Sequence, residues 1–216
     1  RCLIFVTEDA QRTMNTFLGA SQFLPPAAVD AELIASGAIL YLEGYLWDAE
    51  EPKAAMALGI DIARKHERKV AFTLSDTFCV DRHRAEFRDL IDGGKIDILF
   101  ANEAEILMLA ETEDFDAAVA ETAAKVEILV VTRSEKGAIA VRDGQTTAVA
   151  AEPVEHIIDT TGAGDLFASG FLSGYVEQRS MEDCLTMGAI AAAEVISHYG
   201  ARPEADLKEL VKARLG

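Results

Sequence analysis

The chain has 216 residues, of which half are hydrophobic and 7% aromatic, so it contains enough apolar material to bury one ample core. Its formal charge of −17, from 37 acidic and 20 basic side chains, repels nucleic-acid backbones and anionic membrane surfaces, and we expect neither as a partner. Three widely spaced cysteines (Cys2, Cys79 and Cys184) form no C-x-x-C pair, which argues against a disulfide framework or a zinc site and favours a reducing, cytoplasmic location.

Apolar runs of strand length alternate with amphipathic stretches of helix length along the first part of the chain. In chain order, the predicted strands cover 2–7, 38–44, 69–75, 96–102 and 127–133, and the predicted helices cover 52–66, 82–91, a segment from 103 onward and 115–125. The Asp143-Gly144 pair predicts a hairpin turn between the runs AIAVRD and TTAVAA. Three further helices are predicted at 163–178, 181–199 and 204–214.

Apolar strands separated by helices are typical of an α/β fold, with a mostly parallel sheet that is flanked by helices on both faces. Functional sites in such sheets lie outside the carboxyl ends of the strands. The sequence shows no repeat, linker or low-complexity tract, so we expect a single α/β domain over 1–216. Because the chain opens at Arg1 and runs directly into a strand, we expect that domain to be incomplete at its N-terminus.

Residues 159–165 read Asp-Thr-Thr-Gly-Ala-Gly-Asp and lead directly into a predicted helix. Glycines on either side of Ala163 allow several backbone N–H groups to converge without an obstructing Cβ. The helix dipole adds partial positive charge, so this turn is suited to bind an anion. Asp165 stands beside the turn, where its carboxylate can accept a proton from a hydroxyl group next to the anion.

A simpler interpretation is that Gly162 and Gly164 only form a turn and that Asp165 only caps the helix. The segment is not a Walker loop, because no Gly-Lys-Ser/Thr follows it. It is not a Rossmann fingerprint either, because Phe167 stands where the third glycine would be. The spacing alone therefore predicts an anion-binding turn and goes no further.

The longer segment DTTGAGDLFASGFL resembles the C-terminal signature of the ribokinase-like carbohydrate kinases, the phosphofructokinase-B family, and in particular its adenosine-kinase-like branch. The resemblance implies that Gly162, Ala163 and Gly164 form the anion hole. It also implies that Asp165 is the catalytic base that takes the proton from the substrate hydroxyl. In this family a residue at the position of Asp159 lies near a monovalent-cation site.

Further segments follow in the order that this family shows. Asn102-Glu103-Ala104-Glu105 ends a predicted strand and resembles the N-x-x-E motif, which implies that Asn102 and Glu105 organise Mg²⁺ through water. Taken alone, this pattern is equally a helix cap with its capping-box partner. The segment from Thr132 to Gly137 resembles the nucleotide-contact motif T-x-G-x-x-G, with Ser134 where a glycine is usual. A polar hairpin turn is the alternative for that segment.

Two residues are assigned by analogy with the adenosine-kinase-like branch. Arg12 follows the first predicted strand, and the resemblance implies that it clamps the transferred phosphoryl group. Phe78 follows another strand, and the resemblance implies that it stacks on a substrate base. The alternatives are a solvated surface arginine and an apolar loop residue that serves only packing.

The resemblance therefore implies an ATP-dependent kinase that phosphorylates a hydroxyl of an adenosine-like nucleoside or of a sugar such as ribose or fructose. Its expected ligands are ATP and Mg²⁺, with K⁺ as a further candidate, and a homodimer is the candidate assembly. A non-catalytic nucleotide- or nucleoside-binding relative is the alternative. The family's substrate-binding N-terminal segment and most of its small β lid do not precede Arg1, so we expect both to be missing.

Overall fold

The computed structural model describes residues 1–216 and divides into two compact units. The first unit comprises residues 1–18, 133–140 and 147–216, and the second comprises 19–132 and 141–146. The expectation of a single domain that is incomplete at its N-terminus stays a prediction. None of the helices is long and apolar enough to span a bilayer.

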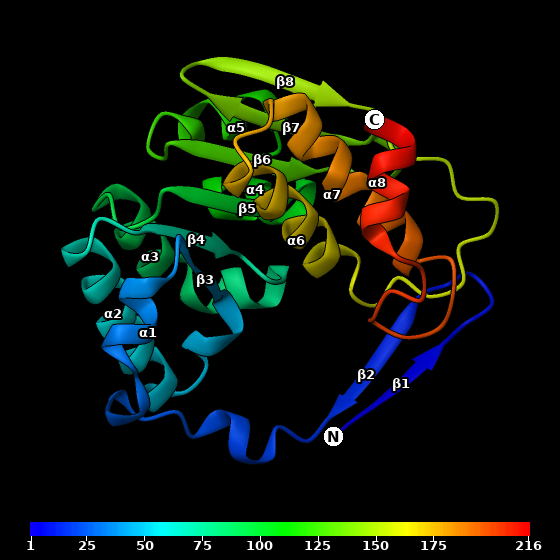
Figure 1. Cartoon of the computed structure of the whole chain (residues 1–216). Helices are drawn as coiled ribbons and strands as arrows, with labels where there is room; N and C mark the ends of the chain where they lie inside the picture. Colours follow the sequence, from blue (N-terminus) through cyan, green and yellow to red (C-terminus); the bar gives the residue numbers. More distant parts are fainter. The chain divides into compact units, whose positions relative to one another are not determined.

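A six-stranded sheet with the strand order β3-β4-β5-β6-β7-β8 is the main element of the fold (Figure 1). Neighbouring strands from β3 to β6 are parallel, so the predicted mostly parallel α/β sheet is confirmed. The strands are β3 (Ile39–Glu43), β4 (Lys69–Thr73), β5 (Ile98–Asn102), β6 (Ile128–Thr132), β7 (Ala138–Arg142) and β8 (Gln145–Val149).

Helices connect the parallel strands, as parallel pairing requires. They are α2 (Glu50–Lys65), α3 (Thr77–Asp92), α4 (Glu103–Ala110) and α5 (Phe115–Ala123), and a short helix α1 (Ala31–Ser36) precedes β3. The predicted hairpin between β7 and β8 is also present. Asp143 and Gly144 have φ of 52° and 72°, which is the pair of positive values that a two-residue type I′ turn needs.

The core of the second unit lies on the central strands of this sheet. Val70, Ala71 and Phe72 are consecutive in β4 and all fully buried, and consecutive side chains of a strand point to opposite faces. Both faces of the sheet are therefore covered. Phe72 also packs edge-on against Trp47 and Phe87, with ring centroids 5.4 and 5.1 Å apart.

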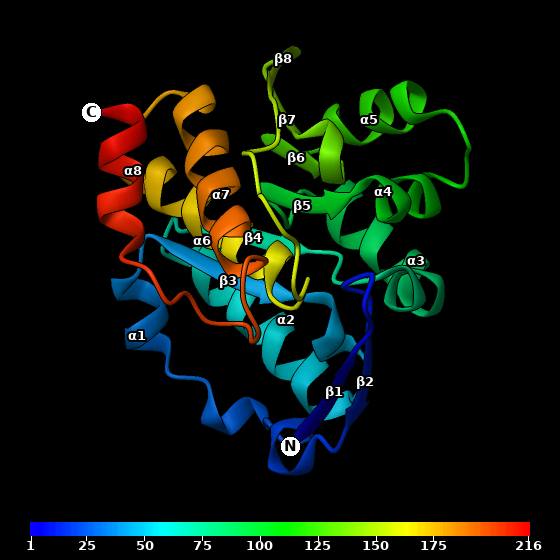
Figure 2. The ribbon, with the colours of Figure 1, turned by 90° about the vertical axis from the view of Figure 1, so that its right-hand side faces the viewer.

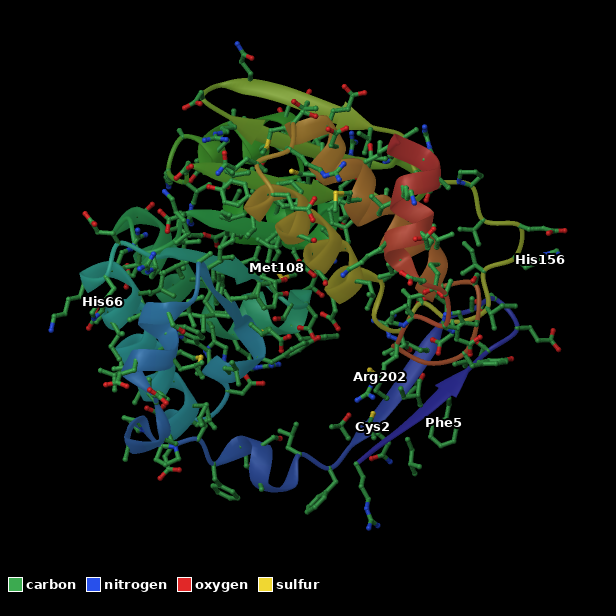
Figure 3. All side chains as sticks on the ribbon, viewed as in Figure 1. Cys2, Phe5, His66, Met108, His156 and Arg202 are labelled. Atoms are coloured by element: carbon green, nitrogen blue, oxygen red, sulfur yellow. The ribbon has the colours of Figure 1, made fainter.

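The first unit contains a two-stranded antiparallel ribbon and three helices. The ribbon pairs β1 (Cys2–Val6) with β2 (Arg12–Thr16), and its side chains are mostly exposed. Phe5, which stands off β1 in Figure 3, is 60% exposed. The helices are α6 (Ala163–Val176), α7 (Met181–Val195) and α8 (Leu207–Leu215), close to the three that the sequence predicts.

Helices α6 and α7 lie side by side in both views of the ribbon and pack almost backbone to backbone (Figure 2). A Cβ added to Gly170 in α6 would lie 2.5 Å from the carbonyl oxygen of Met187 in α7. Likewise, a Cβ added to Gly188 in α7 would lie 2.8 Å from the carbonyl oxygen of Phe167 in α6. Both glycines are therefore required by the approach of the two helices.

We expect Gly170→Ala to lower the free energy of unfolding by about 1–3 kcal/mol, because the added methyl group forces the α6 and α7 backbones apart. Urea unfolding measures the effect. Gly164→Ala is the matched control, because its Cβ would meet nothing within 4 Å, and alanine is the better helix former. Equal effects of the two substitutions would contradict the close packing.

Candidate functional site

The segment that carries the predicted anion-binding turn opens α6 in the first unit. Gly162 is the N-cap residue, with φ of 85°, a value that favours glycine. A Cβ at this position would also lie 3.0 Å from the Cβ of Ala201. Ala163, Gly164 and Asp165 form the first helical turn, whose N–H groups have no acceptor within the helix; that of Ala163 makes a long bond of 3.4 Å to the Thr160 carbonyl oxygen. The turn therefore presents backbone donors and the positive end of the α6 dipole.

Asp165 is the third helical residue of α6 and is exposed. The helix begins without a side-chain capping bond, so Asp165 does not serve as the cap that the simpler interpretation assigned to it. Partial removal from water raises the pKa of this carboxyl above its ordinary value, and the charge of Arg12 acts in the opposite direction. The carboxylate is thus open to solvent beside the donor groups of its own helix mouth.

Arg12 connects the β1–β2 ribbon to this motif. Its Nη1 donates a hydrogen bond of 2.8 Å to Oγ1 of Thr160, and that hydroxyl in turn lies 3.4 Å from the carbonyl oxygen of Ala10. The positive charge of the guanidinium offsets part of the rise in the pKa of Asp165 and adds to the lowering of the pKa of Asp159. Arg12, expected only to follow the first predicted strand, lies at the first position of a second strand, β2.

Asp159 is buried and fixes the shape of the motif. Its Oδ1 accepts hydrogen bonds from the backbone N–H and the hydroxyl of Thr161, at 2.9 and 2.6 Å. Its Oδ2 accepts a third bond of 3.1 Å from the N–H of Gly200. Burial raises the pKa of Asp159, but these bonds outweigh it and the pKa is lowered. The carboxylate is therefore engaged within the loop, and the monovalent cation expected near it stays a prediction.

Asn102 and Glu105 lie in the second unit, where β5 ends and α4 begins. The pair forms a capping box: Asn102 Oδ1 accepts from the Glu105 N–H, and Glu105 Oε2 accepts from the Asn102 N–H. Glu105 Oε1 accepts a further bond of 2.6 Å from Asn102 Nδ2. Burial raises the pKa of Glu105 to about 7, with a smaller contribution from Asp76. The helix-cap interpretation is thus confirmed, and the Mg²⁺ role of the pair stays a prediction.

The parallel register brings Thr132 next to this pair, because Asn102 in β5 and Thr132 in β6 are direct partners at the carboxyl edge of the sheet. No three His, Cys, Asp or Glu side chains of the chain gather into a metal-binding group. Both Glu105 oxygens already accept bonds from Asn102, so direct coordination would compete with the capping box. The pair therefore fits a metal ion that is reached through water and held by another ligand, as Mg²⁺ commonly is.

Phe78 follows the carboxyl end of β4, in the first turn of α3, and is 74% exposed. The alternative interpretation, an apolar loop residue that serves only packing, is therefore wrong. The helix begins at Thr77, earlier than the predicted 82, because the carboxylate of Asp76 caps it by accepting from the Cys79 N–H at 2.6 Å. An Asp before a helical stretch is the signal that could have located this start.

Tyr45 is a residue of this edge that the sequence analysis did not single out. It follows β3, and its hydroxyl donates to the Ser75 carbonyl oxygen at 3.4 Å. Burial and the neighbouring Asp76 raise its pKa well above the ordinary value, so the phenol stays protonated. The strand ends of β3 and β4 thus present two aromatic side chains, Tyr45 and Phe78, at the same edge of the sheet.

Ser134 and Gly137 lie in the first unit, in the short turn between β6 and β7. Gly137 has φ of 85°, and an added Cβ would lie 2.0 Å from the Val149 carbonyl oxygen, so only glycine fits. Ser134 has φ of 50°, in the left-handed region. The position at which the resembling motif has a glycine therefore still adopts the backbone conformation that favours glycine.

The structure places the residues predicted for the site in two groups. The first unit holds the motif from Asp159 to Asp165 together with Arg12, and also contains Ser134 and Gly137. The second unit holds Asn102, Glu105, Thr132 and Phe78, all at or just beyond the carboxyl ends of parallel strands. Each group combines polar side chains with backbone that is shaped by glycines or helix caps.

A parallel α/β sheet with polar strand ends and a glycine-rich helix mouth is typical of the α/β proteins that bind phosphate groups. A comparison with protein families then identifies it more closely: residues 1–207 match the model of the pfkB family carbohydrate kinases. The chain belongs to this family, and the resemblance seen in its sequence is confirmed.

Solved structures and known proteins that resemble the chain are also kinases. A probable sugar kinase from Rhizobium etli is 48% identical over 99% of this chain and 65% of that chain, with a TM-score of 0.97. An adenosine kinase from Sinorhizobium meliloti is 46% identical with the same coverage and a TM-score of 0.96. A cytidine kinase from Thermococcus kodakarensis is 38% identical over 55% of this chain and 43% of its own length. The chain thus spans less than two thirds of each of these relatives.

We expect Ser134→Gly to raise the free energy of unfolding by about 0.5–1 kcal/mol, because it removes the cost of a left-handed L-residue. Thermal and urea unfolding measure this change. The neighbouring Glu135→Gly is the matched control and should destabilise, since the flexible glycine there relieves no strain. A loss of stability in Ser134→Gly would contradict the strained turn.

Proposed function

We propose that this chain forms part of an ATP-dependent kinase that transfers the γ-phosphate to a hydroxyl of an adenosine-like nucleoside, with Asp165 as general base. The observation that carries the proposal is the mouth of α6. There, an accessible carboxylate without a capping role stands one residue beyond a glycine-rich turn of backbone donors. Membership of a carbohydrate kinase family supports the same reaction class.

The chemistry assigns one task to each part of this mouth. Asp165 accepts the proton of the substrate hydroxyl while the hydroxyl oxygen forms a bond to the γ-phosphorus of ATP. The bond from that phosphorus to the bridging oxygen breaks at the same centre, and its electron pair leaves with ADP. The N–H groups of Gly162, Ala163 and Gly164 stabilise the negative charge on the transferred group, and Arg12 provides a cation beside it.

Gly164 supports this assignment through the space that its missing side chain leaves. An added Cβ there meets nothing within 4 Å, and the position is an ordinary helical one that alanine would stabilise. Folding therefore does not require a glycine at 164. A ligand that must approach the backbone N–H groups closely does require one.

The nucleotide is assigned to the carboxyl edge of the sheet and the turn that follows β6. Thr132, Ser134 and Gly137 are the proposed nucleotide contacts, and Asn102 and Glu105 are the proposed partners of Mg²⁺ through water. When bound, the metal ion would neutralise phosphate charge. The capping box keeps the Asn102 and Glu105 side chains in one fixed geometry, which is the contribution of this chain to such a site.

A nucleoside is favoured over a sugar as acceptor by the aromatic side chains at the ends of β3 and β4. Phe78 is 74% exposed and Tyr45 is 49% exposed, which are high values for aromatic side chains. Exposed aromatic faces at the edge where α/β sheets bind ligands are suited to stack on a planar base. The adenosine kinase and cytidine kinase among the relatives accord with this choice.

We expect Asp165→Asn in the intact protein to lower kcat by about 10²–10⁴-fold, because the amide cannot accept the proton. ATP affinity, measured by calorimetry, should be unchanged. Asp183→Asn is the matched control, because Asp183 is the third residue of α7 as Asp165 is of α6, so both feel a helix dipole. Near-native turnover in Asp165→Asn would exclude Asp165 as the base. If the native protein binds ATP but shows no turnover, the non-catalytic alternative is favoured.

We expect Phe78→Ala to raise KM for adenosine by about 5–100-fold, since a stacked aromatic contact of about 1–3 kcal/mol is lost. KM for ATP should not change. Phe23→Ala, which removes another exposed phenylalanine at 65% exposure, is the control. A screen of adenosine, cytidine, ribose and fructose with both variants separates the acceptors. A preference for a sugar that is insensitive to Phe78 would overturn the nucleoside assignment.

A further inference from the structure

The segment that follows α7 packs against the motif at the mouth of α6. We call residues 196–206, between α7 and α8, the α7–α8 loop; Arg202 marks it in Figure 3. Gly200 in this loop donates the backbone hydrogen bond to Asp159, and Ala201 lies so close to Gly162 that a Cβ added to Gly162 would be only 3.0 Å from its Cβ. The N–H of Ile158 also donates to the Ile196 carbonyl oxygen at 2.8 Å. The loop therefore braces the anion-binding turn at several points.

Glu194, in the last turn of α7, closes this loop on itself. Its Oε1 accepts hydrogen bonds of 2.8 Å from the N–H groups of both Glu204 and Ala205. One carboxylate thus joins the end of the helix to the far end of the loop. The Glu194 side chain is only 8% exposed, so these bonds form largely out of water.

His198 lies against the same carboxylate. Its Nε2 is 3.3 Å from Glu194 Oε1, an ion-pair distance without hydrogen-bond alignment, and its Nδ1 donates to the Tyr199 carbonyl oxygen at 3.2 Å. Removal from water lowers the pKa of His198, but the Tyr199 carbonyl and the charges of Glu194 and Glu204 outweigh it, so the pKa is raised. Protonation of the imidazole is therefore easier here than in water.

This arrangement leaves two buried polar atoms without a hydrogen-bond partner, Glu194 Oε2 and His198 Nε2. Burying a carboxylate with incomplete pairing costs stability, and apolar residues of similar size often pack as well or better. A glutamate here is therefore a poor choice for stability alone. The Glu194 carboxylate instead fixes the geometry of the loop through its two backbone hydrogen bonds.

We propose that Glu194 is a positioning residue, which with His198 holds the α7–α8 loop so that Gly200 and Ala201 keep the anion-binding turn in its productive shape. The effect reaches the proposed base through Asp159 and Gly162, and Glu194 itself touches no reacting atom. The inference rests on the proposed kinase function for its kinetic consequence, but its structural consequence stands without it.

The test uses two substitutions of Glu194 in the intact protein and two readouts. Glu194→Ala removes both loop-closing bonds, whereas Glu194→Gln keeps a carbonyl oxygen for Glu204 and Ala205 and loses only the charge facing His198. Glu182→Gln, an exposed glutamate in the first turn of α7, is the matched control. Amide hydrogen exchange over 159–164 and 200–205 reports the loop, and kcat and KM report the reaction.

We expect Glu194→Ala to speed exchange over both segments and to lower kcat by about 10–100-fold, with KM for the acceptor little changed, because the turn is displaced rather than the acceptor site. Glu194→Gln should lie between this variant and the native protein, and Glu182→Gln should match the native protein. Exchange over 159–164 that stays native in Glu194→Ala would overturn the proposal, whatever the activity. If Glu194→Ala does not fold, native exchange and native kcat in Glu194→Gln would overturn it.

If the native protein proves to have no kinase activity, the exchange readout alone decides. Faster exchange over 159–164 in Glu194→Ala would then support the positioning role of Glu194, although the proposed kinase function would be wrong. Exchange confined to 200–205 would show that Glu194 fastens the loop only, which contradicts a positioning role.

Discussion

The structure depends above all on the turn that opens α6, where backbone N–H groups lack helical acceptors. Such groups need a partner, and here no side chain supplies a cap. Gly162 gives the turn its left-handed entry, and Asp159 holds the preceding loop through three hydrogen bonds. The turn is thus pre-formed, so the proposed anion site would need little rearrangement when its ligand binds. In a chain with a net charge of −17, such a local array of donors is the means by which a polyanion can bind.

The second constraint is the parallel register of the sheet. Parallel pairing places successive strand ends at one edge, so residues far apart in sequence, such as Asn102 and Thr132, become neighbours. Helix caps then fix the side chains that follow. Asp76 caps α3 and Asn102 caps α4, and each cap orients polar atoms at the start of a helix. Caps therefore serve both local folding and the geometry of the candidate site.

Much of the fold and of the site could be predicted from the sequence, because its signals are local. The alternation of strands and helices, the Asp143-Gly144 turn and the motif at 159–165 each depend on neighbouring residues only. Strand β2 was missed because its run RTMNT is polar and exposed on all sides, so it has no apolar alternation. The role of Glu194 was beyond sequence reasoning, since it depends on a loop that returns to the helix end.

The analogy with a family motif was most informative where the sequence departs from it. Ser134 replaces a glycine, yet the backbone keeps the left-handed conformation, which shows that the turn is imposed by its surroundings. Conversely, the motif residues Asn102 and Glu105 bond to one another as a capping box, which their spacing alone also predicted. Tertiary context excludes the helix-cap interpretation of Asp165, whereas its role as base stays a proposal.

The glycine contacts between α6 and α7 limit where this protein can vary in evolution. Because the two backbones meet at Gly170 and Gly188, neither helix can gain side-chain volume there or rotate about its axis without separating. Substitutions at these two positions would therefore reorient the helix that carries the candidate site. Substitution costs less stability in the segments that follow β3 and β4, where Tyr45 and Phe78 project into solvent, so these segments can diversify while α6 stays fixed against α7.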